Sequence, residues 1–130
     1  ASRKDPDESP KTSTHRLVSA FDHLVEEHLY ELTRGRADRQ LTITEIAERL
    51  AVSLSHLGEV VKAHTGSTPK QLLANRIVLE AKSILHNTDQ SIAEVAYGLC
   101  FRDASNFTKF FRKRTGISPI EYREMTSRKA

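Results

Sequence analysis

One stretch of this chain occurs twice, and this duplication constrains the fold more than any other feature of the sequence. The two copies read TEIAERLAVSLSHLGEVVKAHTGSTPKQLL and AEVAYGLCFRDASNFTKFFRKRTGISPIEY. Ile46-Ala47 matches Val95-Ala96 at an offset of 49, whereas Thr65-Gly66 matches Thr115-Gly116 at an offset of 50. The offset changes once, between the two helical segments of each copy, where a turn absorbs an extra residue. Each copy is therefore predicted to be a helix, a tight turn and a second helix.

The second helix of each copy has one apolar stripe and one polar stripe. The apolar stripe consists of Leu57, Val60 and Val61 in the first copy and of Phe107, Phe110 and Phe111 in the second. This helical spacing favours core packing of the phenylalanines over base stacking. The polar stripe consists of Ser55, Gly58, Glu59 and Lys62 in the first copy and of Ser105, Thr108, Lys109 and Arg112 in the second. A short helix with one exposed polar stripe fits the width of the DNA major groove.

Apolar spacing and capping residues predict about seven helices and no strand. The expected fold is all-α, with two helix-turn-helix subdomains joined by a long central helix. Thr42 or Thr44 opens the first duplicated helix, and Ser53, Ser91 and Asp103 cap later ones. A further helix at 15–32 packs on the first unit or on a partner domain. The expected boundaries are a flexible linker or tail at 1–14, the first subdomain at 15–68, the connecting helix at 69–87, the second subdomain at 88–126 and a tail at 127–130.

The central helix sets the expected spacing of the two units. From Pro69 to His86 it is about 27 Å long at 1.5 Å per residue. Helices that enter successive major grooves on one face of DNA lie roughly 34 Å apart. A stiff connector of this length is expected to hold two such helices, and a helical bundle without a ligand is the alternative. The positions expected to be buried on this helix are Leu72, Leu73, Ile77, Leu79, Ala81, Ile84 and Leu85.

Composition favours a polyanionic partner and excludes several other classes. The net charge is only +3, but eight Lys and Arg face three acidic residues between Cys100 and Ala130, and a localised cationic end attracts a polyanion. No apolar run approaches the ~20 residues of a membrane span, and no secretion signal is seen. The single cysteine suits a reducing cytoplasm. No zinc-binding spacing, phosphate loop or nucleophile motif is present, so no enzyme activity, metal or cofactor is expected.

Residues from about 40 to 123 resemble the DNA-binding domain of AraC-type bacterial transcription regulators. The most specific stretch, residues 91–123, follows the signature of that family through Ile92, Ala96, Phe101, Ser105, Phe107, Phe111, Gly116, Pro119, Tyr122 and Arg123. The resemblance implies that the second helix of each unit reads a major groove and that a separate domain senses the signal. The family's base-reading positions correspond here to Ser55, Gly58 and Glu59 in the first unit and to Ala104, Ser105, Asn106, Thr108 and Lys109 in the second.

Two positions depart from the family pattern. Cys100 stands where the family usually has glycine, and a backbone with positive φ there would strain a cysteine. Gly58 and Glu59 stand where related proteins often have longer or basic side chains. Because Glu59 only accepts hydrogen bonds, it suits a donor such as cytosine N4 and is repelled by phosphates. The first unit is therefore expected to be a selective but weak reader.

Cationic residues are the main candidates for DNA contact. Lys109 and Arg112 are expected to bind guanine or phosphate, and Lys62 to meet phosphate. Arg102 could meet a phosphate at the helix N-terminus, whereas Arg76 favours an ion pair or a phosphate over a base. The complete predicted set is Ser55, His56, Gly58, Glu59, Lys62, Arg76, Arg102, Ala104, Ser105, Asn106, Thr108, Lys109 and Arg112.

The leading interpretation is sequence-specific binding of double-stranded DNA by a transcription regulator. A helical protein–protein interaction module is the runner-up, favoured by Gly58 and Glu59, and single-strand or RNA binding lacks exposed aromatic residues. The expected partners are duplex DNA, an upstream sensing or dimerisation domain, and RNA polymerase as a further contact. Two unlike reading helices also predict an asymmetric DNA site.

Overall fold

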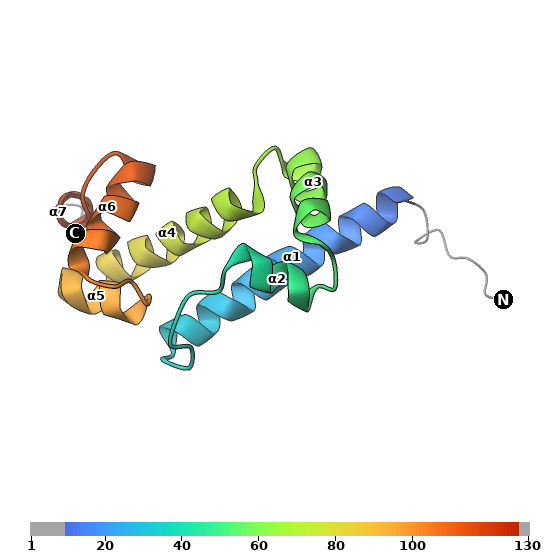
Figure 1. Cartoon of the computed structure of the whole chain (residues 1–130). Helices are drawn as coiled ribbons and strands as arrows, with labels where there is room; N and C mark the ends of the chain where they lie inside the picture. The colour runs from blue at the N-terminus through green and yellow to red at the C-terminus, as the bar shows by residue number, and fades with distance from the viewer. Residues whose placement is uncertain (1–9, 128–130) are drawn as a thin grey trace. The chain divides into compact units, whose positions relative to one another are not determined.

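The computed structural model describes residues 10–127, which form seven α-helices and no strand (Figure 1). This confirms the predicted all-α fold. The helices are α1 (Pro10–Thr33), α2 (Ile43–Arg49), α3 (Leu54–Thr65), α4 (Pro69–Asn87), α5 (Ile92–Gly98), α6 (Ala104–Thr115) and α7 (Pro119–Ser127).

Helix α1 begins earlier than its apolar pattern indicates. The first apolar position of that pattern is Leu17, and the helix was expected from His15, but it starts at Pro10. Proline suits the first turn of a helix, because its φ is already helical and its missing N–H would have no partner there. Residues 10–14 of the predicted linker are therefore helical, and the rest of that linker, like residues 128–130 of the predicted tail, lies outside the described residues.

Capping side chains fix where the short helices start. The Thr42 side chain accepts from the Glu45 N–H while the Glu45 carboxylate accepts from the Thr42 N–H, so Thr42 rather than Thr44 opens α2. The same reciprocal pair joins Ser91 and Glu94 at the start of α5. Ser53 caps α3 and Asp103 caps α6, as predicted.

The described residues divide into two compact units, which are considered separately. The first comprises residues up to Glu27 together with Leu41–Leu73, and the second comprises His28–Gln40 and the residues from Ala74 onward. Both α1 and α4 therefore contribute residues to each unit. These units are defined by contacts and were not expected from the sequence, and the domain boundaries given above stay a prediction. In the first unit the side chains with almost no exposure are Phe21, Val25, Ile46, Ala47, Leu57 and Val61.

The second unit has a well-defined hydrophobic core. Helix α4 contributes Val78 but not Leu79, which is 59% exposed. The expectation that Leu79 is buried is thus wrong. It fails because the buried positions of α4 recur three and four residues apart, and Val78 lies on that stripe whereas Leu79 lies opposite it. The buried cluster consists of Val78, Ala81, Leu85, Val95, Ala96, Leu99, Phe107 and Phe111.

The turn in each helix pair contains a non-glycine residue with a left-handed backbone. The φ angle is 59° at Ala51 and 65° at Cys100, which are equivalent in the repeat. The N–H of Cys100 donates to the carbonyl of Tyr97, and the next N–H donates to the carbonyl of Ala96. The bonds of Ala51 and the following residue repeat this pattern. Because φ at Cys100 is positive, the side chain there carries steric strain.

Replacing Ala51 by glycine is expected to stabilise the first unit. Glycine adopts positive φ without a Cβ clash, and this gain exceeds its extra chain entropy in the unfolded state by about 0.5–1 kcal/mol. Urea unfolding followed by circular dichroism measures the change. Ala20→Gly, at an exposed site within α1, is the control and should destabilise the protein by about 1 kcal/mol. If both variants lose the same free energy of unfolding, the backbone strain at Ala51 is contradicted.

Candidate nucleic-acid interface

Helix α3 presents one polar face to solvent. Leu57 and Val61 are fully buried, whereas Ser55, Glu59 and Lys62 are exposed and Gly58 is half-buried. His56 is also exposed, and its N–H is used by the Ser53 cap. The predicted buried stripe of α3 is therefore confirmed at Leu57 and Val61, whereas Val60 is half-buried. The charged groups of this face are one acid, Glu59, and one base, Lys62.

Helix α6 has the same organisation with a different charge. Phe107 and Phe111 are fully buried, and the opposite face carries exposed Ser105, Lys109 and Arg112. Three further predicted residues on this helix, Ala104, Asn106 and Thr108, are half-buried. Both helices have twelve residues and end at a glycine with φ near 85° (Gly66 at 84° and Gly116 at 86°). The two faces are equivalent in geometry, but that of α6 is cationic.

The basic residues of α6 differ in what they already contact. The guanidinium of Arg114 lies 4.6 Å from the centre of the Phe110 ring, so this charge is held against the core of the unit. Hydrogen bonds from the backbone and side chain of Ser118 lower the pKa of Glu121, and the positive charge of Arg112 lowers it further. Within residues 10–127, Lys109 makes no hydrogen bond or ion pair. Lys109 and Arg112 are thus both exposed cations of this face that are available to a ligand.

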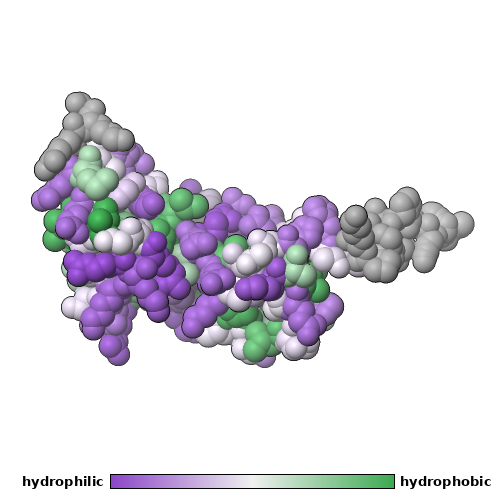
Figure 2. All heavy atoms as spheres, turned by 90° about the horizontal axis from the view of Figure 1, so that it is seen from above, coloured by the Kyte–Doolittle hydropathy of each residue, from purple (hydrophilic) through white to green (hydrophobic). Residues whose placement is uncertain are grey.

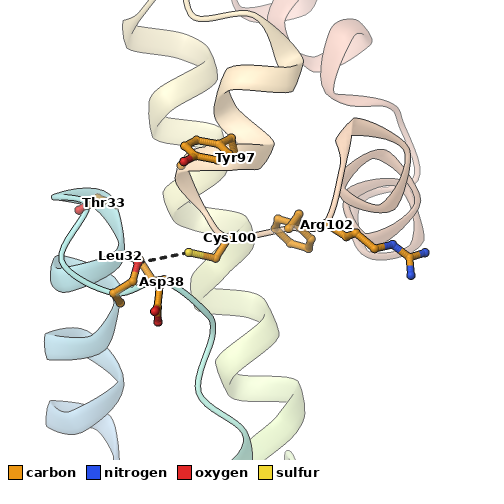
Figure 3. Close-up of a pocket in the computed structure, with 10 residues that line it drawn as sticks. Leu32, Thr33, Asp38, Tyr97, Cys100 and Arg102 are labelled. Carbon is orange, nitrogen blue, oxygen red and sulfur yellow. Dashed lines mark hydrogen bonds between the residues drawn. The ribbon is translucent and has the colours of Figure 1, made fainter.

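The extra residue of the second copy is Arg102. Val52 and Phe101 are the last pair that matches at an offset of 49. Ser53 and Asp103 are the first pair that matches at an offset of 50, so Arg102 has no counterpart in the first unit. Its side chain is 83% exposed, and its Nε lies 4.0 Å from Asp103 Oδ2. Figure 3 shows this side chain extending away from Cys100, toward the start of α6. A cation therefore stands beside the N-terminus of α6, whereas the α2–α3 turn has none.

A cleft of about 540 Å³ lies beside the α5–α6 turn, within the second unit (Figure 3). The Cys100 thiol donates to the Ala37 carbonyl over 3.4 Å. Burial raises the pKa of this thiol, and the charge of Asp38 raises it further. A protonated thiol is a poor nucleophile. The residues that line the cleft are Leu32, Thr33, Gly35, Ala37, Asp38, Tyr97, Gly98, Cys100, Phe101 and Arg102.

Hydrogen bonds hold the end of each exposed helix in the same way in both units. The hydroxyl of Thr65 contacts the carbonyls of Val61 and Ser67. Thr115 makes the equivalent contacts with Phe111 and Ile117. A reciprocal cap then starts the next helix, through Thr68 and Gln71 in the first copy and through Ser118 and Glu121 in the second. The duplication thus extends to individual side-chain hydrogen bonds.

Two contacts that support the α5–α6 pair were not predicted from the sequence. Arg123 of α7 donates to the carbonyls of Leu85, Thr88 and Gln90, and so joins α7 to the end of α4 and to the segment before α5. The amide of Gln40 donates to the Leu99 carbonyl over 2.8 Å. Sequence spacing gives no signal for such contacts, because the partners lie 33 to 59 residues apart.

Replacing Arg123 by methionine is expected to destabilise the second unit by roughly 2–3 kcal/mol, since three carbonyls, two of them in partly buried hydrogen bonds, lose a charged donor. Arg123→Lys should restore only part of this loss, because one ammonium group cannot match a planar fork of donors. Urea unfolding provides the measurement. Arg36→Met is the control, since its contact with Glu31 is exposed and should contribute little. A full rescue by lysine would argue against the three-carbonyl bridge.

The remaining predicted residue, Arg76, lies on α4 outside both polar faces and is half-buried. The structure therefore gathers the predicted residues into one group on α3 and another on α6 with its preceding turn, with Arg76 apart. Hydrophilic residues cover most of the face shown in Figure 2. No described helix is long and apolar enough to cross a membrane. In the same part of the chain, no three His, Cys, Asp or Glu side chains are grouped to hold a metal ion.

Two helix pairs with matching caps, turns and exposed faces define a tandem helix-turn-helix protein. Comparison with known proteins agrees with this class. The family model of a helix-turn-helix domain matches residues 46–125. The transcriptional activator RhaS of Escherichia fergusonii is 33% identical over 107 residues, which are 80% of this chain and 36% of the activator. The chain thus spans about a third of the length of this relative.

Solved structures share the fold. The DNA-binding domain of the global transcriptional factor AdpA, in complex with a target DNA, is 28% identical with a TM-score of 0.71 over 85% of this chain and 95% of that domain. An AraC-type regulator from Chromobacterium violaceum, 20% identical, has the same fold with a TM-score of 0.74 over 91% of this chain and 98% of its own. The chain belongs to the AraC-type helix-turn-helix family of transcription regulators. The resemblance inferred from residues 91–123 is therefore confirmed, and the family is one of DNA-binding regulators rather than enzymes.

Proposed function

We propose that this chain reads double-stranded DNA for a transcription regulator, with α3 and α6 inserted into successive major grooves. One observation carries the proposal above all: each unit holds a short, capped helix whose polar face is free for a ligand while its apolar face is buried. A helix of this size and polarity fits a major groove. The complex of AdpA with its target DNA supports the same assignment.

The charge of the two faces supports a polyanionic ligand. Between Arg102 and Thr115 the second unit has five basic residues and one acid, whereas the segment Ser53–Thr65 has one of each. DNA affinity depends largely on cations that displace counterions from phosphates. We therefore assign most of the affinity to the second unit. The predicted DNA-contacting residues fall into phosphate contacts (Lys62, Arg76, Arg102, Arg112) and groove-facing groups (Ser55, His56, Gly58, Glu59, Ala104, Ser105, Asn106, Thr108, Lys109).

Further partners belong to the same proposal. A sensing or dimerisation domain and RNA polymerase are proposed as partners, because the related RhaS is a transcriptional activator and this chain matches only 36% of its length. The cytoplasm is the proposed location, since a bacterial regulator acts where its DNA lies. The separation of α3 and α6 by one duplex turn stays a prediction.

A protein–protein interaction module is the second candidate. The observation that favours it is the exposed face of α3, where Glu59 stands in place of the basic side chain expected of a DNA-binding helix. A mobility shift of the 130-residue chain against a random duplex library, repeated at several salt concentrations, separates the two. Enrichment of one asymmetric motif spanning about two helical turns supports the regulator. Salt-sensitive binding without enrichment indicates a non-specific DNA binder, and no binding indicates the interaction module.

Lys109→Ala is expected to weaken binding to the enriched duplex by about 1–3 kcal/mol if Lys109 contacts a base. If Lys109 contacts a phosphate, the loss of affinity should be similar for all duplex sequences. The slope of log affinity against log salt concentration should then fall by about one counterion. A fluorescence-anisotropy titration at several salt concentrations gives both quantities. Lys70→Ala is the matched control, because Lys70 is an exposed lysine of α4 outside both faces. Unchanged affinity and salt dependence would remove Lys109 from the interface.

A further inference from the structure

Gly58 lies within α3, where the fold gives no reason for a glycine. A Cβ built at this position meets no atom within 4 Å, and the backbone φ is not positive. Gly66, at the end of the same helix, differs because its φ of 84° favours glycine. Glycine inside a helix lowers its stability relative to alanine. Neither packing nor backbone conformation thus requires a glycine here, and the missing side chain would let a ligand approach the helix backbone closely.

Glu59 is next to Gly58 in the helix, and its carboxylate is available to a ligand. The side chain is exposed, and within residues 10–127 it makes no hydrogen bond or ion pair. A carboxylate facing DNA is repelled by phosphates, so it needs a specific donor. In the major groove guanine offers two acceptors, adenine a donor next to an acceptor, and thymine an acceptor and a methyl group. Cytosine alone offers only a donor, its N4 amino group.

The repeat gives a direct comparison for Glu59. At the offset of 50, Glu59 corresponds to Lys109, and Gly58 corresponds to Thr108. Equivalent positions on two equivalent helices thus carry an acceptor in one unit and a donor in the other. Lysine suits the O6 and N7 acceptors of guanine, whereas glutamate suits the cytosine amino group. Lys62, one turn beyond Glu59 on the same face, supplies a positive charge that offsets the repulsion from nearby phosphates.

We propose that Gly58 and Glu59 form a cytosine-reading site on α3. Gly58 lets the helix backbone approach the base edges, and the short Glu59 side chain then accepts a hydrogen bond from the N4 amino group of one cytosine. This inference rests on the proposed function, because it requires α3 to lie in a major groove. It makes α3 the selective reader and leaves most of the sequence-independent attraction to α6.

The test is selection from a random duplex library by the 130-residue chain and by two variants. Glu59→Lys, which copies Lys109, should change one cytosine of the motif to guanine, and Glu59→Gln should change it to adenine, because an amide pairs with adenine N6 and N7. All other positions should stay the same. For the unaltered chain, replacing that cytosine should lower the affinity about tenfold or more.

The outcomes separate this inference from the proposed function. A motif that is identical for the unaltered chain and both variants would overturn the cytosine-reading site, while the regulator assignment would stand. Failure of the unaltered chain to enrich any motif would overturn the regulator assignment itself. A variant that changes the motif at many positions would also argue against a single contact. Circular dichroism verifies that each exposed substitution leaves the helices intact.

Gly58→Ala tests the close approach. This variant should raise the melting temperature, because alanine favours the helix, and yet weaken binding to the selected duplex about tenfold. Gly98→Ala is the matched control, since Gly98 also lies in a helix, has no atom within 4 Å of a built Cβ, and lies outside both polar faces. It should also raise the melting temperature and leave the affinity unchanged. If the Gly58 variant and the unaltered chain bind the duplex with equal affinity, a close approach of the helix backbone at Gly58 is ruled out.

Discussion

A single left-handed residue in each turn decides where the exposed helix of that unit points. Ala51 and Cys100 have φ near 60°. The N–H of each of these residues and the N–H of the next residue donate to carbonyls of the preceding helix, at equivalent positions in α2 and α5. This bonding satisfies carbonyls at the helix end and reverses the chain within a few residues. The caps at Ser53 and Asp103 then start the next helix. The turn and the cap of each helix pair are thus both formed by residues that lie close together in the sequence.

The repeat is the reason that so much of the fold could be predicted. A strained turn, a cap and a terminal glycine each leave a sequence signal, and two copies make these signals stand out from chance. The single change of offset places the extra residue in the turn, and the equivalent caps at Ser53 and Asp103 leave Arg102 as that residue. The polar faces of α3 and α6 follow from helical spacing alone, and solvent exposure agrees with them. Their role in reading DNA rests on the family and the proposed function.

What sequence spacing does not reveal are the contacts between distant segments. The sequence gives no indication that Gln40 meets the carbonyl of Leu99, or that Arg123 bridges the end of α4 and the segment before α5. These bonds depend on how helices pack, and periodicity describes only one helix at a time. The same limit explains Leu79, since an apolar residue on a central helix is buried only if a neighbour covers that face. Helix α1 also extends past its apolar pattern, because Pro10 favours a helix start without adding an apolar residue.

The two copies have kept their framework and diverged on their ligand-facing side. Caps, turns and terminal hydrogen bonds correspond residue by residue, so both helices are presented in equivalent ways. Charge does not correspond, because Glu59 stands where Lys109 stands in the other copy, and Arg102 has no counterpart. A framework that fixes geometry leaves exposed positions free to vary at little cost in stability, since surface substitutions usually change it by less than about 0.5 kcal/mol. Selectivity can then change at a few side chains while the fold is maintained, and two unlike helices on one chain favour an asymmetric DNA site over a palindrome.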